Sequence, residues 1–102
     1  MQNSILKKIK IKLPDDIINA VSSSEIISML LDKALTKVEY YKSKCKEFEG
    51  KYNMDFSSFK KKVENAGEEE FAEWDDLMIW EGYELASHEW MKKYEELKSC
   101  MA

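Results

Sequence analysis

The feature that most constrains the fold is an unbroken row of apolar residues between positions 27 and 48. Its members recur at alternating spacings of four and three residues: Ile27, Leu31, Ala34, Val38, Tyr41, Cys45 and Phe48. This is the a/d pattern of a helix that packs lengthwise against another helix. Ser22 and Glu25 before the row have the spacing of a capping box, and Gly50 follows it.

The pattern therefore predicts a helix over about 23–49, roughly 40 Å long at about 1.5 Å per residue. In a chain of 102 residues such a helix cannot be surrounded by a globular interior and must pair with another long helix. We expect a homodimer, with its seam formed by the first five members of the row: Ile27, Leu31, Ala34, Val38 and Tyr41.

The residues before this helix predict a short β-strand and a short helix. From Lys8 onward, Lys8, Lys10 and Lys12 alternate strictly with two isoleucines and a leucine, which is the two-residue period of a half-buried strand. Pro14 ends that strand and is favoured in the first turn of a helix. Two aspartates follow it, so we expect a helix of about two turns.

The C-terminal half predicts two further helices. Asp55 is a candidate N-cap for a short helix that closes near Gly67, and three glutamates at 68–70 suit the first turn of a final helix to about Ser99. Gly82 lies inside that helix at a cost of about 1 kcal/mol relative to alanine.

The final helix carries more large apolar residues than a helical hairpin needs. One stripe is Trp80, Tyr83, Ser87, Trp90, Tyr94, Leu97 and Met101, and a second is Phe71, Trp74, Met78, Leu85 and His88. Packing on the 23–49 helix accounts for about half of these side chains. We expect part of the remainder to face a second protein chain, because tryptophan and tyrosine are enriched in binding hot spots.

Charge divides the chain into two halves. Residues 1–62 contain 13 lysines against 8 acidic residues, a charge of +5, whereas residues 63–102 contain 3 against 12, a charge of −9. Two readings remain open: two surfaces with different partners, or two faces that attract each other within a dimer. All 16 basic residues are lysine, and this makes sharp readout of a DNA sequence less expected, since arginine is the usual reader of guanine.

The residues offer little for catalysis or metal binding. The single histidine, His88, is interpreted as a partly buried structural residue, and position 85, three before it, holds Leu rather than the Glu of a Glu-x-x-His metal motif. The two cysteines match no metal or redox spacing, and the sequence lacks an apolar run of about 18 residues or a signal peptide. We expect a cytoplasmic protein with no enzymatic activity, no metal, no other cofactor and no membrane association.

Lys8, Lys10 and Lys12 have two interpretations. Lysines on one strand face can lie along a phosphate backbone or in a major groove, as in paired β-ribbons that bind DNA. They also protect an edge strand from aggregation, and from the residues alone this is the favoured interpretation.

Two segments resemble a known group of proteins. The stretch KYNMDFSSF at 51–59 and the stretch EWDDLMIWE at 73–81 are together similar to small prokaryotic antitoxins of toxin–antitoxin pairs. The opening KIKIKLPDD at 8–16 resembles the strand and first turn of ribbon-helix-helix proteins, although the interval from Pro14 to Ser22 is shorter than their usual first helix.

The resemblance implies a non-enzymatic antitoxin that binds and neutralises a cognate toxin protein, with operator DNA as a further partner. Carried over by position, the three strand lysines would face DNA. The acidic C-terminal helix would bind the toxin, and we expect this partner surface to comprise Phe71, Trp74, Asp75, Asp76, Trp80 and Tyr83.

The sequence thus predicts a mainly α, dimeric protein with a short N-terminal strand, a long heptad-patterned helix, a short helix and an aromatic C-terminal helix. Residues 1–50 form the dimerisation and possible DNA-binding part, and residues 51–102 the partner-binding part of one structural unit. The alternative is a non-catalytic helical self-assembly or adaptor module without DNA binding, in which the strand lysines serve solubility.

Overall fold

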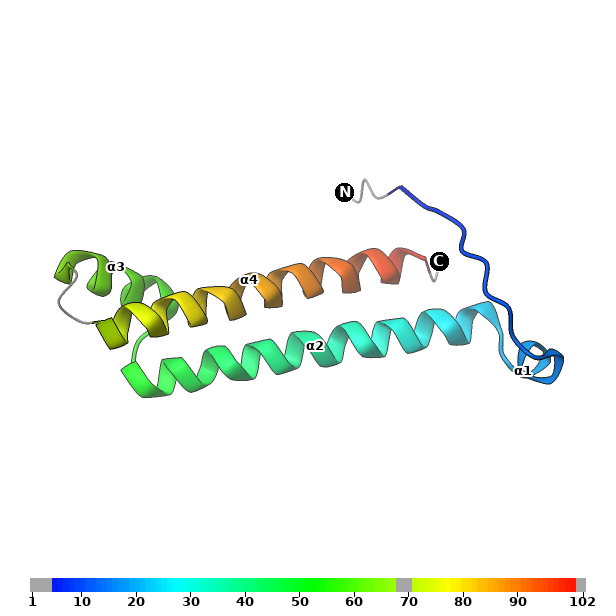
Figure 1. Ribbon diagram of the computed structural model, residues 1–102, viewed down its shortest axis with the longest axis horizontal. Coiled ribbons are helices and arrows are strands. Elements are labelled where there is room, and N and C mark those ends of the chain that lie inside the picture. Colours follow the sequence, from blue (N-terminus) through cyan, green and yellow to red (C-terminus); the bar gives the residue numbers. More distant parts are fainter. Residues whose placement is uncertain (1–4, 68–70, 101–102) are drawn as a thin grey trace.

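The computed structural model describes residues 5–67 and 71–100, and these form a long helical hairpin. Four helices follow one another: α1 (Asp15–Ala20), α2 (Ser23–Tyr52), α3 (Phe56–Ala66) and α4 (Phe71–Ser99). Helices α2 and α4 run antiparallel side by side along most of the molecule, which measures 61 × 28 × 20 Å (Figure 1). α3 packs across one end of this pair, which we call the closed end. α1 and residues 5–14 lie at the other, open end (Figure 1).

The mainly α fold and the positions of its helices are confirmed. Ser22 caps α2, since its Oγ accepts a hydrogen bond from the backbone N–H of Glu25 at 3.2 Å. Asp55 caps α3 in the same way through Ser58 N–H at 2.8 Å, and Gly67 ends α3 at a φ of 77°. α2 continues past the predicted stop at Gly50 and ends at Tyr52, and the next residue, Asn53, takes the left-handed conformation. Residues 68–70 and Met101 lie outside the described residues.

The predicted N-terminal strand is wrong. Residues 5–14 have no regular secondary structure, and the part of the chain that the structure describes contains no strand. A strand needs a neighbour to pair its backbone N–H and C=O groups, and no other extended segment lies beside this one. Residues 5–14, here called the arm, instead leave α1 and cross outside the hairpin (Figure 1).

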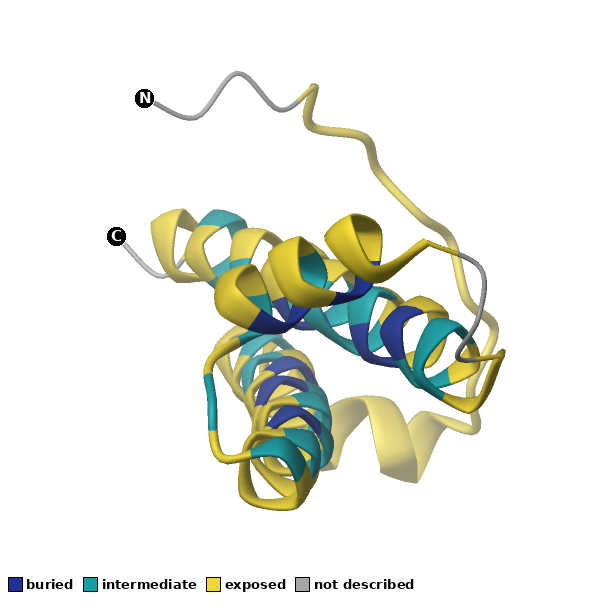
Figure 2. Cartoon of the chain, turned by 90° about the vertical axis from the view of Figure 1, so that its left-hand side faces the viewer, coloured by how far each residue is buried: buried dark blue, intermediate teal, exposed yellow. Residues whose placement is uncertain are grey.

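The core lies at the closed end, where three helices meet. Its buried residues come from α2, α3 and α4: Cys45, Phe59, Val63, Leu77 and Trp80. Trp80 is fully buried; its ring stacks on Phe48 with centroids 5.6 Å apart and contacts Phe59 at 5.3 Å. Farther along the hairpin Ala34 and Val38 are also buried, whereas the arm and α1 are exposed throughout and are yellow in Figure 2.

The predicted need of the long helix for a partner helix is met within the chain. Ala34 and Val38 are buried against α4, and Tyr41 lies 6.1 Å from Tyr83, centroid to centroid. Ile27 and Leu31 are half-buried in the same row. Because α4 occupies this row, a dimer contact has to use other residues.

Candidate partner-binding surface

Helix α4 has an inner face that packs on α2 and an outer face that points to solvent. Leu77, Trp80 and Ser87 are its buried residues, and half-buried Trp90, Tyr94 and Leu97 continue the inner face toward the open end. The first predicted stripe is therefore the core-facing side of α4. Most of the second stripe is exposed: Phe71 by 75%, Met78 by 70% and Leu85 by 59%.

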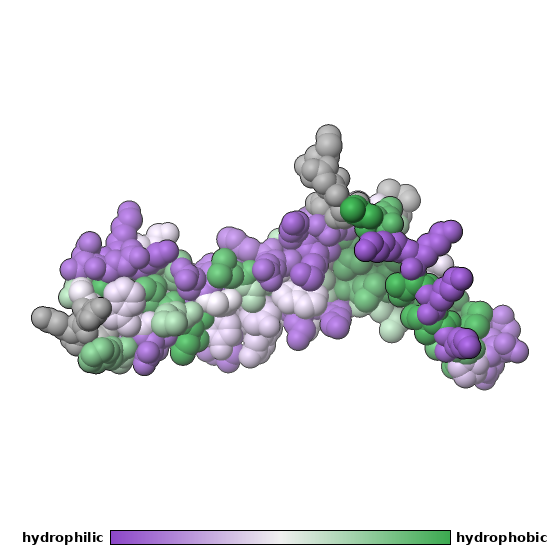
Figure 3. Space-filling model, turned by 45° about the horizontal axis from the view of Figure 1, so that its top comes forward, coloured by the Kyte–Doolittle hydropathy of each residue, from purple (hydrophilic) through white to green (hydrophobic). Residues whose placement is uncertain are grey.

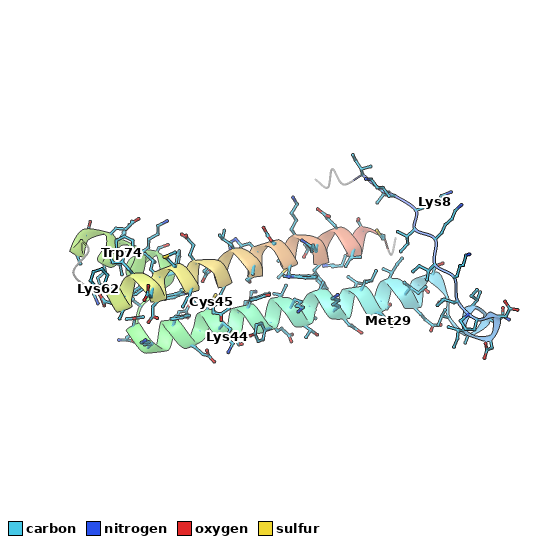
Figure 4. All side chains as sticks on the ribbon, viewed as in Figure 1. Lys8, Met29, Lys44, Cys45, Lys62 and Trp74 are labelled. Atoms are coloured by element: carbon cyan, nitrogen blue, oxygen red, sulfur yellow. The ribbon has the colours of Figure 1, made fainter. Side chains whose placement is uncertain are left out.

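Of the six residues expected to bind a partner, some are buried in the hairpin and others are exposed. Trp80 is 0% exposed and Tyr83 is half-buried against Phe48, so both serve the core. Trp74 is also half-buried, and its indole Nε1 donates to the carbonyl oxygen of Gly67 at 2.6 Å. Its position at the closed end, beside α3, is seen in Figure 4.

The Asp76 side chain connects α4 to α2 through hydrogen bonds. It accepts hydrogen bonds from the Lys51 Nζ at 2.6 Å and from the Tyr52 hydroxyl. The hydrogen bond from Lys51, followed by that from Tyr52, lowers the pKa of the Asp76 carboxyl below its usual value. Burial, with the nearby Asp76 as the next cause, raises the pKa of Tyr52. Asp76 is therefore a structural carboxylate, and only Phe71 and Asp75 of the six face solvent.

The outer face of α4 carries a row of exposed apolar side chains. Phe71, Met78 and Leu85 follow one another at intervals of seven residues, which places them on one side of a helix, and Ile79 adds a neighbour that is 50% exposed. The expected site omitted Met78, Ile79 and Leu85. The seven-residue spacing of Phe71, Met78 and Leu85 could have identified this row. The expected site instead favoured Trp74 and Trp80, because tryptophan is enriched in binding hot spots.

Cys45 and His88 are two further titratable residues of the hairpin. Cys45 is buried, and burial followed by its hydrogen bond to Glu84 raises the pKa of its thiol to about 12, which leaves it unreactive. Figure 4 places it on α2 beneath α4. His88 is exposed, contrary to its interpretation as a partly buried residue. It lies beside Leu85 at an open pocket that the start of α3 also lines.

The open end carries a second apolar surface. Eleven of the sixteen exposed large hydrophobic side chains belong to residues 5–35, including Ile9 at 80% and Ile11 at 67% exposed. Lys8, Lys10 and Lys12 are exposed between them, so green and purple side chains alternate along the arm (Figure 3). Figure 4 shows Lys8 on the part of the arm that stands away from the helices. A cavity of about 660 Å³ lies between the arm and the hairpin, with Leu30, Trp90 and Leu97 in its wall.

Among the described residues, none of the helices is long and apolar enough to cross a membrane. Comparisons of the chain with models of protein families, with curated proteins and with solved structures found no match.

Proposed function

We propose that this chain is a non-enzymatic, antitoxin-like protein that neutralises a cognate toxin protein by binding it on the outer face of α4. The observation that carries the proposal is the row of Phe71, Met78 and Leu85, whose side chains are 75%, 70% and 59% exposed. Exposed apolar rows rimmed by polar residues are typical of protein–protein contacts.

The charge of the second half supports a basic partner. Residues 63–102 carry a charge of −9, and an acidic helix bound over a basic nucleic-acid site would block that site. Asp75 lies beside the apolar row and is exposed. We place the protein in the cytoplasm, where its two free cysteines remain reduced.

The proposed protein is a homodimer, but its contact is not the row 27–41 that the sequence predicted. The row 27–41 packs against α4, so we place the dimer contact at the open end, where most of the exposed hydrophobic side chains lie. The arm is uncovered in the single chain, and two arms could pair their free backbone groups with each other. That arrangement would set Lys8, Lys10 and Lys12 of both copies on one surface, available to operator DNA.

The toxin proposal is tested with the product of the adjacent gene, since toxins and antitoxins are encoded as pairs. The two proteins are coexpressed and the complex is isolated through a tag on this chain. We expect a stoichiometric complex and restored growth of cells that make the neighbour. The triple variant Phe71→Ser, Met78→Ser, Leu85→Ser should lose both, because it removes the apolar row while leaving the core intact.

A control variant of α2, Tyr40→Ser, tests for general loss of exposed apolar surface, since this side chain is 51% exposed and lies outside residues 5–35. It should bind as the natural chain does. A chain that does not bind the neighbour, or that binds it equally well in both variants, would contradict the proposal. The self-assembling adaptor module would then be the better account.

A further inference from the structure

Gly82 lies in the middle of α4, and the described part of the chain gives no structural reason for a glycine there. Gly82 lies well inside the helix, where glycine is less favourable than alanine. Gly67 is the only glycine with a positive φ among the described residues, so Gly82 is not needed for its backbone conformation. A Cβ atom built on Gly82 would meet nothing within 4 Å, so no close approach inside the molecule requires it either.

The position of Gly82 connects it with the outer face. It follows Met78 by four residues and precedes Leu85 by three, so the three lie on one side of α4. Met78 and Leu85 project into solvent, and Gly82 leaves a gap between them in which backbone is exposed. Small residues in such places let a second helix approach closely and receive one of its side chains.

Exposed acidic residues border this gap along the helix. Asp75 and Glu89 each lie seven residues from Gly82, on its two sides in the sequence, and both are exposed. Neither has an ion-pair partner in the part of the chain that the structure describes, in contrast to Glu73 and Glu81, which pair with lysines of α3. The outer face therefore offers an apolar centre with a gap, and a free carboxylate beyond each end of it.

We infer that Gly82 is the crossing point at which a helix of the bound toxin packs across α4. That helix inserts an apolar side chain between Met78 and Leu85 and carries lysine or arginine opposite Asp75 and Glu89. This rests on the proposed function. A helix is the fitting partner because α4 satisfies its own backbone hydrogen bonds and offers no edge to an extended strand. A second copy is disfavoured, because pairing this face with itself would bring free carboxylates together.

The test compares Gly82→Ala with Gly50→Ala in the full chain. Gly50 lies in α2, is exposed, and likewise has nothing within 4 Å of an added Cβ. Both variants should melt at a higher temperature than the natural chain, since alanine favours a helix. Only Gly82→Ala should weaken binding to the purified product of the adjacent gene, by about tenfold, because its methyl group fills the gap.

A second pair of substitutions tests the charges. Asp75→Asn with Glu89→Gln should slow association and reduce its dependence on salt, with the melting temperature little changed. If the natural chain binds the neighbour and Gly82→Ala binds it equally well, the crossing point is wrong while the proposed function stands. If the natural chain does not bind the neighbour at all, both are wrong.

Discussion

Asp76 shows how one carboxylate can close a helical hairpin. It extends from α4 to Lys51 and Tyr52 in the last turn of α2, while two further ion pairs, Lys60–Glu81 and Lys62–Glu73, tie α3 to α4. The Asp76 side chain is only 17% exposed, so solvent screens its contacts less than those of a surface pair. Sequence alone could not separate Asp76 from exposed Asp75, since adjacent acidic residues differ only in the helix face that each occupies.

Replacing this carboxylate should change both stability and its dependence on pH. We expect Asp76→Asn to lower the free energy of unfolding at pH 7 by about 1–2 kcal/mol, through loss of a charge-assisted hydrogen bond. The folded-state pKa of Asp76 is lowered, so its contribution is present above the ordinary aspartate pKa and is lost as the pH falls through the folded value.

Urea unfolding at neutral pH and near pH 3 checks this prediction. The difference between the natural chain and Asp76→Asn should shrink at the acidic pH, whereas Asp75→Asn should match the natural chain in stability at both. A difference that stays constant between the two pH values would contradict the assigned role.

At the scale of elements, local signals predicted the helices well and their partners poorly. The heptad row and the caps at Ser22 and Asp55 located α2 and α3, because caps and periodicity act within a few residues. The row could not tell whether its partner was a second copy or α4, since both present apolar stripes. Alternation in the arm predicted a strand, but a strand forms only beside another strand, and the sequence cannot show whether one is present.

The cap of α2 gives a prediction at this scale. Ser22→Ala should cost about 1 kcal/mol, because the N–H of Glu25 loses its acceptor at the helix start. In a domain of this size that lowers the melting temperature by about 4–8 °C, as followed by circular dichroism. Ser28→Ala, a substitution at an exposed site within the same helix, should leave the melting temperature equal or higher. Equal losses in the two variants would speak against the cap.

At the scale of the whole molecule, the two ends of the hairpin differ in what covers their apolar residues. The closed end has a core of five buried side chains drawn from three helices, whereas residues 5–35 hold most of the exposed hydrophobic ones. A chain this short buries a modest share of its surface, so an uncovered end of this kind favours association. The sequence predicted a homodimer through the row 27–41. Because Ala34 and Val38 of that row are buried against α4, we propose the contact at the open end instead.

Size-exclusion chromatography with light scattering tests the open-end dimer. The natural chain should have the mass of a dimer at micromolar concentration. Ile9→Ser with Ile11→Ser should give a monomer of unchanged helix content, since the arm contributes no helix. Lys8→Ser with Lys10→Ser, which alters the same segment but not its apolar side chains, should remain a dimer. A natural chain that is monomeric throughout would refute this contact.

The antiparallel arrangement of α2 and α4 also sets an order of assembly. Tyr52 and Asp76 at the closed end are 24 residues apart in the chain, whereas Leu30 and Leu97 at the open end are 67 apart. Closing the longer loop first costs about 1 kcal/mol more entropy, and at the open end fewer buried contacts repay it. Folding should therefore start around α3 and advance toward the arm. The arm and the start of α2, which leave the ribosome before α3 and α4, are then the last segments to pack.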